Sequence, residues 1–427
     1  MAEADIASFL EAHCQDLVDT LSQLVQTKTT NPYSGDREPS SEAAGQQLLA
    51  EMLSELEPRL DLFDCPDDIY ARLGVLGPEE RSFAGRPNLV AIFELGAPGP
   101  TVVVNGHMDT VGIDNMSIEP LGAEVRDGWM YGRGTSDCKG GLAAALWAIR
   151  AVLSVGPDLG GRIILESVVD EECNGSGAGT LACLNRGYQG DVAIFVDGYD
   201  GRISRGCYGC LTARVLVEGR EGHGASGTGV SALEKALLVK RGVDEFKRRR
   251  EALYPDARVN LGVFRSGTHP AVVPGMAEMQ LNVVYRLEDA QASLATGGSW
   301  GASVLREEFG KAVASAARGD SWLEEHPPQV GWIKDLIPFQ ETEHSPWLAR
   351  LKEAYTAATG RAPLTDLMIG WTDASYYSAL AGVPTFLIGP SADGKAHSPD
   401  ECVEIAALVR SAKVLSTFLV RTLAGGD

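Results

Sequence analysis

The chain has 427 residues, of which 44% are hydrophobic and 22% charged, and its formal net charge is −21. This composition is typical of a folded soluble protein, and the length predicts two or three domains, of which we expect two. The acidic excess would repel a polyanion over most of the surface, so nucleic acid is not an expected ligand. An acidic N-terminus and the lack of a long apolar run predict a cytoplasmic protein without a membrane span.

The first half of the chain alternates between helical and extended patterns. Apolar residues at helical spacing predict helices at 6–26, 41–56, 142–153 and 177–186. Runs rich in β-branched residues predict strands at 88–93, 101–105, 162–169 and 192–196, with a loop at 96–100. This alternation predicts an α/β fold with a mostly parallel sheet that carries helices on both faces.

The pattern changes near residue 207, where 211–217 alternates as a half-solvated antiparallel strand should. Further elements of this region are expected at 229–248, 258–264, 278–286, 302–316 and 329–333. Strand–helix alternation then returns, with elements expected at 345–358, 385–388 and 401–423. We therefore predict an inserted α+β domain at 207–332, within an α/β domain formed by 1–206 and 333–427.

Imidazole and acidic side chains follow three of the predicted strands. His107 and Asp109 lie two residues apart, so their side chains share one face. Asp109 could accept the second N–H of a metal-bound His107 and so orient the ring. Glu171, Glu172 and Asp197 follow two neighbouring strands. Because ligands bind beyond the carboxyl ends of parallel strands, these residues are expected to meet at one edge of the sheet.

Asp137 and His397 complete a possible two-metal set. Two imidazoles and several carboxylates suit zinc and, less selectively, cobalt or manganese. Such a site needs a bridging carboxylate and a terminal imidazole for each ion, and Asp137 could bridge while His107 and His397 terminate. Glu171 and Glu172 are adjacent carboxylates, so we expect one to bind metal and the other to move protons.

Three long motifs stand out: Gly-His-Met-Asp-Thr-Val at 106–111, Gly-Arg-Gly-Thr-Ser-Asp-Cys-Lys-Gly-Gly at 132–141, and Asp-Glu-Glu-Cys-Asn-Gly-Ser-Gly at 170–177. Shorter ones lie at 222–225, 273–274, 285–286, 370–373 and 396–401. The resemblance is to the di-zinc aminoacylase and carboxypeptidase family, which includes acetylornithine deacetylase, succinyl-diaminopimelate desuccinylase, glutamate carboxypeptidase and carnosinase-type dipeptidases. It extends over nearly the whole chain and implies a zinc-exopeptidase-like catalytic domain.

The resemblance also implies roles for the metal ligands. One zinc would be held by His107, Asp137 and Asp197. The other would be held by His397, Asp137 and Glu172, with Asp137 as the bridge. Glu171 matches the general base and Asp109 the residue that orients His107, while the Asp137–Cys138 peptide bond matches a position that is cis in the family.

Residues outside the metal set receive roles in the same way. His223 lies in the inserted domain, and its family counterpart stabilises the oxyanion in the active site of the partner subunit. A homodimer through this lid or dimerisation domain is therefore implied. Arg286, Thr372 and Asp373 match positions that line the substrate pocket, where a guanidinium would suit a carboxylate.

The function that the resemblance implies is a di-zinc amidohydrolase. It would cleave the amide bond of a small carboxylate-bearing N-acyl amino acid, using a metal-bridging hydroxide and Glu171. Alternatives are a dipeptidase, tripeptidase or carboxypeptidase of the same family, and a non-catalytic binding protein on this fold. Asp197 looks like the aminopeptidase and dipeptidase members, whereas the 170–177 motif looks like the deacetylase branch. His269 is either a substrate contact or a loop residue, and we favour the loop residue.

Overall fold

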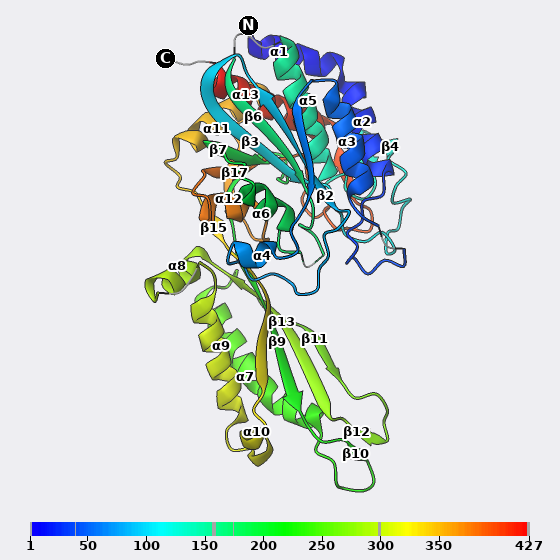
Figure 1. Ribbon diagram of the computed structural model, residues 1–427, viewed down its shortest axis with the longest axis vertical. Coiled ribbons are helices and arrows are strands. Elements are labelled where there is room, and N and C mark those ends of the chain that lie inside the picture. The colour runs from blue at the N-terminus through cyan, green and yellow to red at the C-terminus, as the bar shows by residue number, and fades with distance from the viewer. Residues whose placement is uncertain (1, 39, 156–158, 174, 298–299, 425–427) are drawn as a thin grey trace.

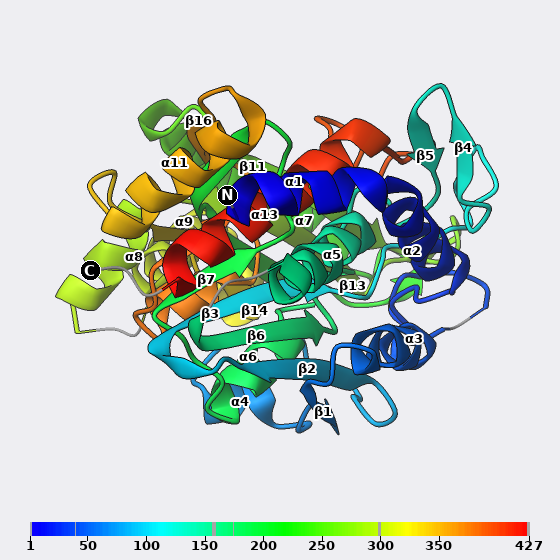
Figure 2. The same ribbon diagram turned by 90° about the horizontal axis from the view of Figure 1, so that it is seen from above.

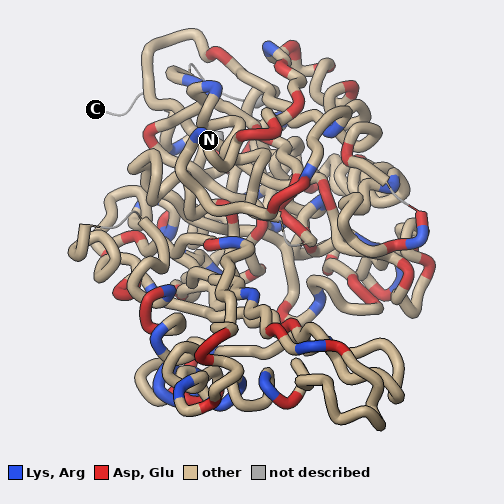
Figure 3. The backbone as a smooth tube through the Cα atoms, turned by 60° about the horizontal axis from the view of Figure 1, so that its bottom comes forward, with Lys and Arg blue, Asp and Glu red and all other residues tan. Residues whose placement is uncertain are grey.

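The computed structural model describes residues 2–38, 40–155, 159–173, 175–297 and 300–424, and it has two parts (Figure 1). The upper part in Figure 1 is built on a nine-stranded sheet and contains both ends of the chain. The lower part is elongated and is built on a four-stranded sheet with two long helices along it. Acidic segments are distributed over both parts, with basic segments among them (Figure 3).

The large sheet has a parallel centre and mostly antiparallel edges. Its strands are β1 (Arg59–Asp64), β2 (Pro87–Glu94), β3 (Ala97–His107), β6 (Gly160–Val168), β7 (Val192–Phe195), β8 (Arg202–Cys207), β15 (Phe339–Gln340), β16 (Leu364–Met368) and β17 (Thr385–Leu387). The order is β1-β2-β6-β3-β7-β17-β8-β15, with β16 beside β8. Strands β6, β3, β7 and β17 run parallel to one another, and this confirms the α/β class predicted from the sequence.

Helices cover both faces of this sheet (Figure 2). Val102 and Val104 of β3 pack into one apolar cluster, and Val103 between them packs into another on the opposite face. The first face is covered by α1 (Ala2–Ala12), α2 (Cys14–Gln26), α3 (Ala43–Ser54), α5 (Lys139–Val155), α11 (Pro346–Thr359) and α13 (Ile405–Leu423). The second carries α4 (Ile69–Arg72), α6 (Ala178–Asn185) and α12 (Ala374–Ala379). Central strands buried on both faces explain the continuous apolar runs in the sequence.

The lower part, which we call the lid, has its own apolar core. Its antiparallel sheet has the order β11-β13-β9-β14, formed by β9 (Gly209–Glu218), β11 (Val259–Ser266), β13 (Met276–Tyr285) and β14 (Gln329–Leu336). One face packs on α7 (Ala232–Leu253) and α9 (Ser303–Ala317). Smaller elements are β10 (Gly222–His223), β12 (Val272–Val273), α8 (Leu287–Ala295) and α10 (Ser321–Glu325). The boundary at residue 332 stays a prediction, and β14 continues past it to Leu336.

A small three-stranded sheet joins distant parts of the chain beside the large one. It consists of β4 (Glu124–Arg126), β5 (Trp129–Tyr131) and β18 (Cys402–Glu404). Because β18 pairs with β5, the loop that precedes β18 lies against the loop that follows β5. This pairing brings the His397 segment close to the Asp137 segment.

Several local predictions were wrong. The helix expected at 6–26 is two helices that meet at His13, whose Nδ1 contacts the Phe9 carbonyl oxygen at 2.9 Å. The loop expected at 96–100 belongs largely to β3, which begins at Ala97. Strands β8 and β16 and helix α8 were not predicted, and the two strands show no regular alternation of buried and exposed residues. In the described ranges, no helix is both long and apolar enough to cross a bilayer.

Candidate metal centre

His107 ends strand β3 and is buried. Its Nδ1 lies 2.9 Å from the main-chain carbonyl oxygen of Asp109 and 3.6 Å from the Asp109 carboxylate. The carbonyl oxygen can only accept a hydrogen bond, so Nδ1 carries the proton and the ring orientation is fixed by the main chain of Asp109. Nε2 then faces Asp137 Oδ1 at 2.9 Å. In the neutral ring this nitrogen is an acceptor, so a proton or a metal ion is needed between it and the carboxylate.

Asp137 lies between the two histidines. Its Oδ1 is 2.9 Å from His107 Nε2, and its Oδ2 is 3.1 Å from His397 Nε2. Burial opposes ionisation of Asp137, but hydrogen bonds from both imidazoles hold its pKa below the usual range. The Asp137–Cys138 peptide bond is cis, as the resemblance implied. A carboxylate with one oxygen directed to each imidazole has the geometry of a bridging ligand.

Glu401 fixes the loop that carries Asp137. Its Oε1 accepts main-chain hydrogen bonds from Gly134 at 3.1 Å, Ser136 at 2.9 Å and Asp137 at 3.1 Å. Its Oε2 pairs with Arg133 Nη1 at 2.6 Å, and both side chains are buried. Desolvation nevertheless raises the pKa of Glu401 to about 7. Glu401 precedes β18, so pairing of β18 with β5 helps to set the position of Asp137.

The structure brings the predicted ligands into two groups. His397 Nε2 is 2.9 Å from Glu172 Oε1, and these two residues form one group with Asp137. The second group contains His107, Asp197 and also Cys138. Ligand atoms within each group lie within 4.8 Å of one another. Cys138 was not among the predicted ligands, although its position beside Asp137 in the motif could have indicated it.

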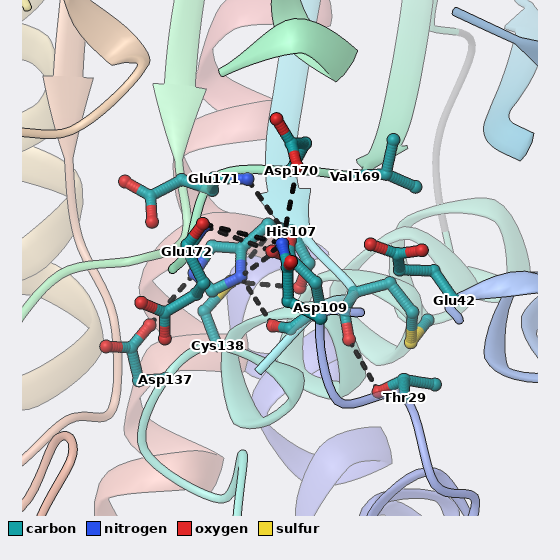
Figure 4. A network of polar contacts seen from close by, with 12 residues as sticks. Thr29, Glu42, His107, Asp109, Asp137, Cys138, Val169, Asp170, Glu171 and Glu172 are labelled. Carbon is teal, nitrogen blue, oxygen red and sulfur yellow. Dashed lines mark hydrogen bonds and ion pairs between the residues drawn. The ribbon is translucent and has the colours of Figure 1, made fainter. Parts of the chain in front are cut away.

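Asp109 organises the turn that carries Glu171 and Glu172 (Figure 4). Its buried carboxylate accepts the N–H of Glu172 at 3.0 Å, the N–H of Glu171 at 3.3 Å and the side-chain amide of Asn31 at 2.9 Å. The two glutamates point to the same side of the turn, and Glu172 is directed toward Asp137 (Figure 4). Thus the carboxylate of Asp109 positions the turn, while its carbonyl oxygen orients His107.

Buried negative charge dominates the site. Desolvation raises the pKa of Glu171 and of Asp197 well above the usual range and raises that of Glu172, and nearby carboxylates add to each shift. For His107, burial acts against protonation, but Cys138 and Asp137 hold its pKa well above the usual value. Hydrogen bonds to Asp137 and Glu172 raise the pKa of His397 to about 11. A site with this excess of carboxylates fits the binding of cations.

These residues form one end of a cleft of about 690 Å³. The cleft continues along β8, β16 and the segments next to them, where it is lined by Tyr199, Arg202, Ser204, Asp366, Met368, Ile369, Trp371 and Asp393. Arg202 is the positively charged residue in this part of the cleft lining, and it pairs with Asp366 at 3.3 Å and with Asp393 at 2.5 Å. A larger groove, about 1100 Å³, lies between α7 and α9, but the residues that line it include neither histidine nor cysteine.

The other predicted site residues lie outside the cleft lining. Thr372 and Asp373 are buried, and the Thr180 hydroxyl donates to Asp373 at 2.5 Å. Arg286 is the residue before α8, 3.7 Å from Asp256 and over the Tyr254 ring.

Two of the three lid histidines, His223 and His269, lie near each other at the far end of the lid. His223 is exposed on β10 and pairs with Val272 of β12, three residues from His269. The Nδ1 atom of His269 accepts the N–H of Ala271 at 3.1 Å, as a loop residue would. Because β10 lies at the lower end of the lid in Figure 1, His223 does not join the metal cluster of its own chain.

Three solved structures that share this fold are named as peptidases. The TM-score is 0.74 with a di-peptidase from Saccharomyces cerevisiae, at 15% identity and 100% coverage of both chains. It is 0.73 with human carnosine dipeptidase 1, at 15% identity and 99% coverage of both. A tripeptidase from Staphylococcus aureus gives 0.72 at 19% identity, with 96% of this chain and 99% of that chain covered. At these identities the likeness shows the fold alone, which has the same two-part architecture over nearly the whole chain.

The family follows from the sequence match. Peptidase family M20/M25/M40 matches residues 103–421, and the chain belongs to this family of hydrolases, which act on amide and peptide C–N bonds. It is 29% identical to an N-formyl-4-amino-5-aminomethyl-2-methylpyrimidine deformylase from Halalkalibacterium halodurans over 455 residues, with 98% of both chains covered. It is 30% identical to a succinyl-diaminopimelate desuccinylase from Gluconacetobacter diazotrophicus over 358 residues, with 80% of this chain and 85% of the relative covered.

Proposed function

We propose that this protein is a metal-dependent N-deacylase, which hydrolyses the amide bond between a small acyl group and an amine. The observation that carries the proposal is the Asp137 carboxylate, with one oxygen directed to each of two imidazoles beside half-buried Glu171 and buried Glu172. The relatives named above are a deformylase and a desuccinylase, and both names describe removal of an acyl group. They support a deacylase over a peptidase.

Two ions, expected to be zinc with cobalt or manganese as alternatives, fit the donor set. One would be held by His107, Asp137 and Asp197, and the other by His397, Asp137 and Glu172. Bound metals polarise the amide carbonyl group and lower the pKa of water. The buried excess of carboxylates around Asp137 supports this assignment, because uncompensated charges of one sign are costly away from solvent.

Glu171 is the proposed general base. It would accept a proton from the attacking water and then deliver it to the leaving nitrogen. Burial raises the pKa of Glu171 above the usual range, which makes its carboxylate a stronger base toward the attacking water. Asp109 would hold Glu171 in place through the main chain of the turn.

His223 is proposed to act in the partner subunit, where it would stabilise the oxyanion. Its exposure, and its place at the end of the lid away from its own metal cluster, support this role. The active protein would then be a homodimer through the lid, and we retain the prediction that it is cytoplasmic.

Two classes of substrate are candidates. A carboxylate-bearing N-acyl amino acid would use a guanidinium in the cleft, but Arg202 is already paired with Asp366 and Asp393. An amine that carries hydrogen-bond donors, such as an N-formyl aminomethylpyrimidine, would instead meet the Asp366 carboxylate and the rings of Tyr199 and Trp371. The second candidate fits the charge of the cleft better, and the deformylase relative supports it.

A metal titration combined with a substrate panel tests the proposal. Metal-free protein would be reconstituted with zinc, cobalt or manganese and assayed on the N-formyl aminomethylpyrimidine, N-acetyl and N-succinyl amino acids, and free-amine dipeptides. We expect metal-dependent release of the acyl group, fastest from the pyrimidine. Hydrolysis of dipeptides alone would instead establish a peptidase. Binding without turnover of any compound would establish a non-catalytic binding protein.

A further inference from the structure

The turn between Asp170 and Cys173 has an unusual backbone. Both of these residues adopt positive φ angles, 66° at Asp170 and 56° at Cys173. Residues other than glycine rarely adopt this conformation and keep it only where the surroundings hold it. Glu171 and Glu172 lie between them, so whatever holds the two ends also sets the direction of both glutamates.

One arginine side chain contacts both ends of this turn. Arg81 Nη1 lies 2.5 Å from Asp170 Oδ1, and Arg81 Nη2 donates to the Cys173 carbonyl oxygen at 2.5 Å. The side chain is only 5% exposed, and its guanidinium lies over the Tyr33 ring at 4.2 Å. A planar, stacked guanidinium presents its donors in a fixed geometry, so the two contacts fix the separation of the two ends.

The charge of Asp170 does not by itself explain Arg81. Asp170 also pairs with Arg86 at 3.1 Å and accepts the Tyr70 hydroxyl at 3.0 Å. Arg86 is shared with the buried carboxylate of Glu42, 2.6 Å away, so Arg81 is needed to balance the charge of Asp170, but that charge explains only one of its two contacts. The distinct contribution of Arg81 is that it connects the side chain at the start of the turn to the main chain at its end.

We propose that Arg81 is a positioning residue that clamps the Asp170–Cys173 turn and so sets the placement of Glu171. The clamp acts together with Asp109, which binds the two N–H groups in the middle of the same turn. The catalytic consequence rests on the proposed function, because it requires Glu171 to be the base. The structural consequence, a less ordered turn without the clamp, does not require it.

The test compares Arg81→Lys with Arg72→Lys, a matched change in an exposed pair with Asp68. A lysine ammonium keeps a positive charge beside Asp170, but it lacks the planar fork that spans the two acceptors. In metal-free protein, hydrogen exchange at the Glu171 and Glu172 amides should be about tenfold faster in Arg81→Lys and unchanged in Arg72→Lys. With metal bound, kcat should fall about tenfold while KM and metal content stay near wild type.

The two readouts separate the possible failures. Unchanged exchange and unchanged kcat in Arg81→Lys would overturn the proposal, and so would a loss of activity that only follows a loss of metal. If wild-type protein hydrolyses no amide, the deacylase assignment fails, whereas faster exchange would still support the clamp. Should Arg81→Lys not fold, Arg81→Ala supplemented with free guanidinium replaces it. Recovery of slow exchange on addition of guanidinium supports the clamp, and no recovery contradicts it.

Discussion

The α/β part buries several ion pairs, whereas most ion pairs of the lid are at least partly exposed. In the α/β part, the Arg133–Glu401 pair is 2% and 0% exposed, and Arg86 and Glu42 are comparably buried. In the lid, the Arg214–Glu278 pair is 48% and 18% exposed, and the Arg250–Asp289 pair is a buried exception. Burial of charge is costly, whereas exposed pairs contribute little to stability. We infer that the buried ion pairs of the α/β part reduce its stability but fix the positions of its polar groups. The lid is stabilised mainly by its apolar core.

The largest effect is expected at the proposed base. Glu171→Gln keeps the size of the side chain but cannot exchange the proton, so kcat should fall about 10³-fold with metal content unchanged. Glu278→Gln on the lid is the control and should turn over normally. Steady-state kinetics and metal analysis measure both. A metal-loaded Glu171→Gln variant that turns over at the wild-type rate would remove Glu171 from the mechanism.

The next effect concerns stability in the α/β part. Glu166 is fully buried and accepts hydrogen bonds from Asn105 at 2.7 Å and Tyr377 at 2.6 Å, and desolvation raises its pKa to about 7 from 4.5. Glu166 therefore ionises at lower pH in the unfolded chain than in the folded protein. Protonated Glu166 therefore contributes stability that is fully present below about pH 4.5 and is lost as pH rises through 7. The loss in unfolding free energy is about 3 kcal/mol.

Denaturant unfolding of metal-free wild type and Glu166→Gln between pH 4 and 8 measures this contribution. As pH rises, the unfolding free energy of the wild type should fall relative to that of Glu166→Gln, because glutamine does not titrate. A constant difference across this range would show that Glu166 has an ordinary pKa in the folded protein.

The third prediction concerns His223, the lid residue proposed to act in the partner subunit. His223→Ala should lower kcat about 10²-fold, because a donor to the oxyanion is lost, while stability stays near wild type. Mixing His223→Ala with Glu171→Gln subunits should restore part of the activity, since one site of the mixed dimer then has both groups. A fully active monomer, or mixed dimers without activity, would contradict the exchange of His223 between subunits.

The smallest effect is expected on the lid surface. Arg214→Ala removes the partner of Glu278, 2.8 Å away, and should change the free energy of unfolding by less than about 1 kcal/mol. Glu401→Gln in the α/β part should cost more, because it leaves Arg133 as a buried cation without its carboxylate. Equal costs in the two parts would remove the contrast between them.

The sequence allowed much of the site to be predicted, for a physical reason. His107, Glu171 and Asp197 each follow a strand of one parallel sheet, so their proximity could be inferred from strand ends alone. Their roles as ligands or base stay predictions. The clamp was not predictable, because Arg81 lies 89 residues from Asp170 in a segment without regular structure. Strand β16 was missed because its five residues show no alternation in burial.

The lid is inserted into the sequence of the α/β part, and this insertion has a consequence for folding. The lid strands β9 to β14 come from one continuous stretch, whereas β17, at Thr385–Leu387, inserts between β7 and β8 of the large sheet. Contacts between residues that are distant in sequence form slowly, and chains generally fold from the N-terminus during synthesis. We expect the lid to fold first and the large sheet to close late. The metal centre then assembles last, because His397 reaches Glu172 across 225 residues.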